Sequence, residues 1–300
     1  MTEPLVFVVQ GPTASGKTLL AIELAQRFQT EIISFDSRQF YQELNIGVAR
    51  PTAEELAAVQ HHFVATHSIQ TPLNANEFAK QAQAKFTALV KQNGAVVLVG
   101  GSALFADALL LGLDPLPHDP SIQQKWQAFY AQEGLSALQN ELAQKDPAFF
   151  AQIDQMNPVR LLRALEVVEL TGQSNLELRG GPKADPPHLR RFFIDWPREE
   201  LYARINRRVD LMIQEGLEQE ARCFYPDQQK LQALQTVGYQ EFFDFFNGQI
   251  SRDEAIEKIK QHSRNYAKRQ LTWLKKYAQI HALNPHAKPT IIDQALQRIG

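Results

Sequence analysis

Three short runs of apolar residues in the first hundred positions predict buried β-strands. Residues 5–9, 31–34 and 95–99 are rich in Val, Ile, Leu and Phe and lack the polar alternation of a half-buried strand. Residues 17–27, 77–92 and 103–111 place apolar side chains at helical spacing after or between these runs. Strands that alternate with helices in this way are typical of a doubly wound α/β sheet, a fold whose ligands bind beyond the carboxyl ends of the strands.

The hydrophobic pattern changes after a group of prolines at positions 115, 117 and 120. Residues 119–156 read as helices rich in Gln and Ala, without a strand, and predict an inserted helical subdomain. Residues 1–118 and 157–300 would then form the core. There the pattern indicates a helix to about position 170, a loop over 173–188, a strand at 191–194 and helices from 198 to about 278.

The segment between the first strand and the first helix reads Gly-Pro-Thr-Ala-Ser-Gly-Lys-Thr and fits every fixed position of a phosphate-binding P-loop. The glycines let backbone amides converge on phosphate oxygens, and the helix N-terminus adds favourable partial charge. Lys17 supplies a charge for the terminal phosphates, and the Thr18 hydroxyl is a candidate ligand for Mg²⁺. The predicted phosphate-binding residues are Gly11, Thr13, Ala14, Ser15, Gly16, Lys17 and Thr18. The fold class is therefore P-loop NTPase-like, although kinases, ATPases and other transferases all use this loop.

Two more polar segments follow the other predicted strands. Asp36, after the second strand, could act as a magnesium ligand, a general base or a loop cap. Gly100 and Gly101, after the third, could cradle an oxyanion or permit a tight turn. P-loop NTPases place an acid at the end of a central strand to organise Mg²⁺ and water, whereas glycines occupy that position here. This difference disfavours phosphoryl transfer.

Composition and charge exclude several classes of protein. A single cysteine in 300 residues excludes an internal disulfide and a multi-cysteine zinc site. No apolar stretch reaches the roughly 20 residues of a membrane span, and no signal peptide is evident, so we expect a cytoplasmic protein. The net charge is only −2, but residues 258–276 contain seven Lys or Arg and no acid. Arg264, Lys268 and Arg269 could form a nucleic-acid contact or a solvated helix surface.

Taken together, these segments resemble the tRNA dimethylallyltransferases, also called tRNA isopentenyltransferases. The P-loop octapeptide matches that family without change, and Asp-Ser-Arg-Gln-Phe-Tyr at 36–41 fits its Asp-Ser-x-Gln-x-Tyr motif. Further matches follow in order at 46–51, 61–62, 100–105, 157–167, 237–239 and 264–273. The sequence departs from the family pattern where Ser102 replaces a threonine, Phe105 a tyrosine, Arg50 a lysine and Leu217 a phenylalanine. The cysteine-rich zinc finger of eukaryotic members is missing, which points to the bacterial type.

The resemblance implies transfer of a dimethylallyl group from dimethylallyl diphosphate to N6 of the adenine that follows the anticodon of tRNA. Asp36 would be the general base and Ser102 would stand near the leaving oxygen or the target base, while Lys17, Arg222 and a Thr18-bound Mg²⁺ would hold the diphosphate. Residues implied to bind the tRNA anticodon stem-loop are Ser37, Gln39, Asn157, Arg160, Arg163, Arg264, Lys268 and Arg269. A monomer that binds no membrane is expected. An adenylate isopentenyltransferase acting on free AMP, ADP or ATP is the alternative in the same fold, and a P-loop kinase or a non-catalytic RNA-binding module is a more distant one.

Overall fold

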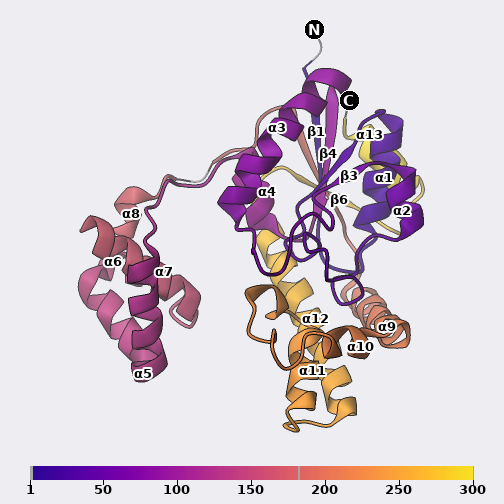
Figure 1. The fold of residues 1–300 in the computed structure, drawn as a ribbon. Coiled ribbons are helices and arrows are strands. Elements are labelled where there is room, and N and C mark those ends of the chain that lie inside the picture. Colours follow the sequence, from indigo (N-terminus) through magenta and orange to yellow (C-terminus); the bar gives the residue numbers. More distant parts are fainter. Residues whose placement is uncertain (1–2, 182, 300) are drawn as a thin grey trace. The chain divides into compact units, whose positions relative to one another are not determined.

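A parallel sheet forms the centre of the fold in the computed structural model, which describes residues 3–181 and 183–299. Within these residues six strands pair in the spatial order β3-β2-β4-β1-β5-β6 (Figure 1). They are β1 (Leu5–Gln10), β2 (Ile32–Ser34), β3 (His61–His62), β4 (Ala95–Gly100), β5 (Leu189–Ile194) and β6 (Ile280–Leu283). The strands predicted near 5–9, 31–34, 95–99 and 191–194 are confirmed, whereas the two edge strands β3 and β6 were not predicted.

Helices cover both faces of this sheet, as Figure 1 shows. On one face Phe7 and Val9 of β1 pack with α1 (Lys17–Arg27) and α13 (Ile291–Gln297). On the other face Val6 and Val8 pack with α3 (Ala75–Asn93) and α4 (Ala103–Leu110). Successive side chains of a strand point to opposite faces, so β1 and β4, covered on both sides, are almost entirely apolar. The predicted doubly wound α/β fold is confirmed.

The C-terminal helices build a second core next to the sheet. They are α9 (Arg198–Glu215), α10 (Leu217–Arg222), the 3-10 turn η1 (Gln232–Leu234), α11 (Tyr239–Phe246) and α12 (Arg252–Leu274). Tyr239 and Ile259 are buried there against Tyr41 and Leu44 from the loop after β2, while the short α2 (Ala53–Ala58) packs on α1. The prediction of helices from 198 to about 278 differs from the structure in two places. Residues 223–238 form turns around Pro226, which has no amide proton to donate, and α12 ends at Leu274.

The inserted unit is larger than predicted. It runs from Leu113 to Ala184 rather than over 119–156, and the rest of the chain forms the other compact unit. It contains α5 (Pro120–Lys145), α6 (Pro147–Phe150), α7 (Pro158–Thr171) and α8 (Asn175–Leu178), the last within the predicted 173–188 loop. Leu161 and Leu165 of α7 pack on Trp126, Leu138 and Leu142 of α5, so α7 completes the hydrophobic core of the insertion instead of belonging to the sheet domain.

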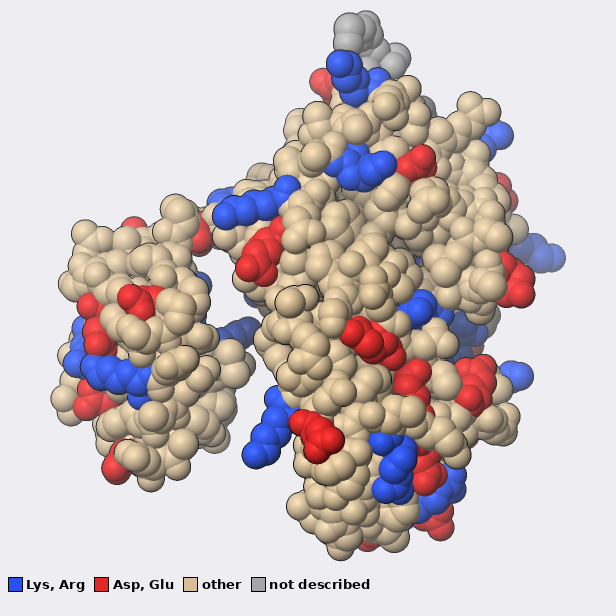
Figure 2. All heavy atoms as spheres, in the orientation of Figure 1, with Lys and Arg blue, Asp and Glu red and all other residues tan. Residues whose placement is uncertain are grey.

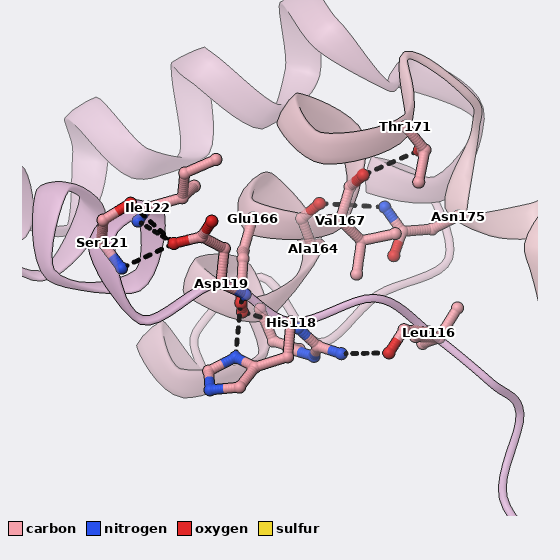
Figure 3. A network of polar contacts seen from close by, with 11 residues as sticks. Leu116, His118, Asp119, Ser121, Ile122, Ala164, Glu166, Val167, Thr171 and Asn175 are labelled. Atoms are coloured by element: carbon pink, nitrogen blue, oxygen red, sulfur yellow. Dashed lines mark hydrogen bonds and ion pairs between the residues drawn. The ribbon is translucent and has the colours of Figure 1, made fainter.

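A buried carboxylate fixes the start of this unit (Figure 3). Glu166 of α7, only 1% exposed, accepts hydrogen bonds from the Asp119 amide at 2.9 Å and from Arg163 at 2.6 Å, and it pairs with His118 at 2.6 Å. Arg163 also donates to the Leu116 carbonyl at 3.1 Å. Burial alone would raise the pKa of Glu166, but the bonds from Arg163, the Asp119 amide and His118 together hold it below its ordinary value. The network therefore attaches the entering chain to α7.

Candidate active site

The P-loop forms a turn with three residues at positive φ angles. Gly11 and Gly16 have φ angles of 145° and 93°, which favour glycine, and Ala14 also has a positive φ of 61°. The carbonyl groups at the outside of this turn are paired: Arg204 donates to Ala14 at 2.8 Å, and the Trp196 indole donates to Ser15 at 2.8 Å. Gly16 then caps α1, whose first amides have no partner within the helix. These amides are the donors that a phosphate would use.

Lys17 and Asp36 line the same chamber, a cavity of about 370 Å³ between the P-loop, the loop after β2 and the C-terminal helices. The Lys17 ammonium donates to the Pro12 carbonyl at 3.3 Å, and Asp36 accepts from the Arg38 amide at 3.2 Å. Burial lowers the pKa of Lys17 to about 8; the charge of Asp36 opposes this effect and that of Arg208 adds to it. The chamber thus holds one carboxylate, Asp36, and two cations, Lys17 and Arg208, whose charges act on one another.

Arg208 is the site residue that sequence reasoning missed. Its guanidinium donates to the Thr13 hydroxyl at 3.1 Å and to the Ala49 carbonyl at 3.3 Å, and it lines the chamber. Burial lowers the pKa of Arg208 while Asp36 counteracts this, and an arginine keeps its proton at neutral pH in any case. A signal was present in the sequence, because Arg204 and Arg208 stand four residues apart on one face of α9.

Arg222, to which we assigned a diphosphate contact, is not part of this site. It ends α10, is exposed, and lies over the ring of Phe246, with its guanidinium carbon 3.3 Å from the ring centre. It lines neither the chamber nor the separate hollow that borders Thr18 beside the P-loop. The neighbouring Glu220 has a structural role instead, accepting hydrogen bonds from the amides of residues 45–47 at 2.8–3.1 Å.

Ser102 lies behind the chamber wall. Its hydroxyl accepts the Ser37 amide at 3.0 Å and lies 2.9 Å from the Ser37 hydroxyl, so the end of β4 and the loop after β2 are joined. Tyr266 of α12 reaches the same place. Burial and the neighbouring Asp36 raise the pKa of Tyr266 to about 12, while its hydrogen bond with Ser102 works in the opposite direction. Ser37, Tyr266 and Asp36 face the cavity, and Ser102 supports them.

The glycine pair at the end of β4, Gly100 and Gly101, makes room for close contacts. A Cβ atom on Gly100 would lie 2.5 Å from the Phe35 ring and 2.9 Å from the Asp36 amide nitrogen. A Cβ atom on Gly101 would lie 2.3 Å from Nε2 of Gln270 and 3.5 Å from Oδ2 of Asp36. We predicted either an oxyanion cradle or a tight turn for Gly100 and Gly101, and the structure gives a third, steric reason for them: side chains here would push Asp36 and Gln270 out of place.

The predicted tRNA-binding residues fall in three places. Ser37, Gln39 and Arg269 line the chamber, and Gln39 donates to the Val48 and Ala49 carbonyls at 3.2 and 2.9 Å. On α12, Arg264 donates to Asn206 at 2.6 Å and Lys268 is exposed.

The remaining three predicted contacts belong to the inserted unit. There Asn157 caps α7, Arg160 is exposed and Arg163 is engaged by Glu166. Figure 2 shows basic and acidic side chains interspersed over the face drawn, without a continuous basic surface. On that face, any contact with a polyanion would depend on individual cations.

The structure offers few side chains to a metal ion. Thr18 borders a second hollow of about 900 Å³ beside the P-loop, together with Lys17, Arg204 and Arg207. Within residues 3–181 and 183–299, no three His, Cys, Asp or Glu side chains cluster as a protein-built metal site would require. Nor is any helix in these ranges both long and apolar enough to cross a membrane.

The chain is similar to known proteins in both sequence and structure. The sequence model of the family described as IPP transferase matches residues 39–277. A tRNA dimethylallyltransferase of Cytophaga hutchinsonii is 44% identical over 282 residues, covering 93% of this chain and 92% of that protein. One of Chlorobium chlorochromatii is 40% identical, covering 98% and 97%. The crystal structure of a tRNA isopentenylpyrophosphate transferase of Bacillus halodurans superposes with a TM-score of 0.70 at 34% identity, covering 94% of this chain and 90% of that one. The chain therefore belongs to the IPP transferase family.

Proposed function

We propose that the chain transfers a dimethylallyl group from dimethylallyl diphosphate to N6 of the adenine next to the anticodon, on its 3′ side, in tRNA, and releases diphosphate. One observation carries this proposal: a carboxylate, Asp36, and two cations, Lys17 and Arg208, share a chamber beside a P-loop. Curated relatives that are 40–44% identical over nearly the whole chain are tRNA dimethylallyltransferases, which supports tRNA rather than free AMP as the acceptor.

The cations serve departure of the diphosphate. When the bond between the allylic carbon and the bridging oxygen breaks, negative charge accumulates on the diphosphate. The P-loop amides, Lys17 and Arg208 are donors held in place before the reaction, and preorganised donors of this kind commonly contribute more to catalysis than any other single effect. Arg208 takes the role first assigned to Arg222, because it bonds directly to Thr13 of the P-loop. No phosphoryl group moves.

A magnesium ion fits this arrangement with Thr18 as its protein ligand. Mg²⁺ keeps several waters and commonly binds through one or two protein groups and the phosphates of the substrate, so a cluster of carboxylates is not required. Bound there, it would neutralise charge on the diphosphate. The hydroxyl of Thr18, next to Lys17 at the start of α1, is the protein group that would hold it.

Asp36 serves the nucleophile. The exocyclic amine of adenine is a poor nucleophile because its lone pair is delocalised into the ring, and it must lose a proton as the new carbon–nitrogen bond forms. A carboxylate in reach of that amine is a general base, a role worth typically 10²–10⁴-fold in rate. Ser102 fixes the loop that carries Asp36 through its two contacts with Ser37.

The acceptor is a base presented by single-stranded RNA. Bases in loops are unstacked at little cost, and specific RNA recognition usually targets them. Arg269 lies at the chamber, with Lys268 and Arg264 on the same helix, so a strand that enters would meet cations of α12.

A transfer assay tests the proposal. The protein is incubated with Mg²⁺, labelled dimethylallyl diphosphate and either tRNA or AMP, and ATP hydrolysis is measured in parallel. We expect label in tRNA, none in AMP and no ATP turnover. Asp36→Asn should bind tRNA normally and lose at least about 100-fold in turnover. Label in AMP alone would identify an adenylate isopentenyltransferase, and steady ATP hydrolysis would identify an NTPase.

A further inference from the structure

Gln270 connects two segments of the chamber that are far apart in the sequence. It lies on α12, is 8% exposed, and uses both polar atoms of its side-chain amide. Oε1 accepts the Thr13 amide of the P-loop at 3.1 Å, and Nε2 donates to the Gly101 carbonyl after β4 at 3.0 Å. The two bonds span 257 and 169 positions of sequence. Each bond has correct donor–acceptor geometry, which also fixes the orientation of the amide.

The surroundings of Gln270 are shaped for this contact. Gly101 has no Cβ, and an atom there would lie 2.3 Å from Nε2 of Gln270, closer than any real contact. The next closest atom to that position is Oδ2 of Asp36, at 3.5 Å. Gly101 therefore lies between Gln270 and the carboxylate of Asp36, and the close approach of Gln270 is what requires a glycine there.

The contacts on either side extend the connection to the reacting groups. The Thr13 amide donates to Gln270, and the Thr13 hydroxyl accepts a hydrogen bond from Arg208. The residue after Gly101 is Ser102, whose hydroxyl accepts a hydrogen bond from the amide of Ser37, the residue after Asp36. One side of the Gln270 amide therefore leads to the cation of the diphosphate site, and the other side leads to the general base.

We propose that Gln270 is a positioning residue that sets the separation between the diphosphate site and Asp36. This inference rests on the proposed transfer reaction. Both groups must act on one substrate pair at the same moment, and a misplacement of about 1 Å can cost 10²-fold in rate. Gln270 also places α12, which carries Lys268 and Arg269, in a fixed register with the P-loop.

Two variants isolate this role. Gln270→Met keeps the length of the side chain and removes both hydrogen bonds. Gln270→Glu keeps the acceptor for the Thr13 amide but sets a carboxylate oxygen against the Gly101 carbonyl. Gln261→Met, on an exposed position of the same helix, is the matched control. For each protein we would measure kcat, the Kd for inorganic diphosphate, the Kd for tRNA and the melting temperature.

A positioning role predicts that kcat falls about 10–100-fold in both Gln270 variants, while both Kd values stay within about threefold and the control is unchanged. Gly101→Ala should reproduce the loss, and adding Gln270→Met to it should cost little more, because both changes break one connection.

Three results would overturn the inference. The first is a kcat within twofold of the parent. The second is a loss of diphosphate affinity as large as the loss of kcat, which would make Gln270 a direct ligand. The third is collapse of the melting transition in both variants, which would make it purely structural. If the parent protein itself transfers no label to tRNA, the proposed function fails instead, so the two failures are distinguishable.

Discussion

Lys17 should lose its charge at a pH where every arginine of the chamber is still protonated. Burial lowers the pKa of Lys17 from 10.5 to about 8. One pKa unit corresponds to about 1.4 kcal/mol, so the buried ammonium is disfavoured by about 3 kcal/mol in the free protein. Because the folded pKa lies below the unfolded one, this unfavourable contribution is fully present below pH 8 and is relieved as the pH rises towards 10.5. A bound diphosphate should raise the pKa of Lys17 again, because its negative charge favours the protonated amine.

The assay is kcat/KM for dimethylallyl diphosphate between pH 7 and 9.5 at saturating tRNA. At pH 9 only about one amine in ten is charged at a pKa of 8, so kcat/KM should fall about tenfold per pH unit above 8. Binding of inorganic diphosphate at pH 9 should take up close to one proton, measurable by calorimetry in two buffers, and almost none at pH 7. Lys17→Met has no amine to titrate, so its activity should start lower and show no fall in this range.

A flat profile up to pH 9.5 together with no proton uptake would refute this reasoning, since either the amine would not be desolvated or its charge would not be used. A falling profile that persists in Lys17→Met would assign the titration to another group. Arg208 cannot be that group, because a guanidinium stays protonated over this range.

The other predictions concern the cations and the inserted unit. Arg208→Ala should lower kcat about 10²–10³-fold, as removal of a preorganised donor to a developing charge typically does, while Arg222→Ala should stay within twofold in the same assay. Lys268→Ala should weaken all tRNAs alike and reduce the slope of log affinity against log salt by about one; an unchanged slope would place this side chain outside the interface. Glu166→Gln should lower the unfolding free energy of the inserted unit by about 2–3 kcal/mol in denaturant melts at pH 7, and by less in acid, where the parent carboxylate is itself protonated; equal melts at pH 7 would contradict the network drawn in Figure 3.

Local signals predicted local structure well. The first helix begins at Lys17 and ends at Arg27 as expected, because a glycine-rich turn and an apolar stripe define it without distant partners. The edge strands β3 and β6 were not predicted because segments of two and four residues are too short to show a hydrophobic periodicity. The border of the insertion was misplaced for a different reason: α7 has an apolar face that suits any core, and only packing on α5 decides which core it joins.

The site shows the same limit more sharply. Sequence patterns placed the P-loop and Asp36 after predicted strands, and the carboxyl ends of parallel strands share one edge of the sheet. The choice between Arg222 and Arg208 could not be made in that way, since both stand on C-terminal helices whose rotation depends on side-chain packing. The reason for the glycine pair at 100 and 101 could not be inferred from the sequence. Gly101 is required because Gln270, 169 positions later, approaches its backbone. A glycine in a sequence does not show which distant residue will pack against it. The sequence thus identifies the chemistry at the strand ends, and the tertiary contacts through α9 and α12 decide which side chains carry it out.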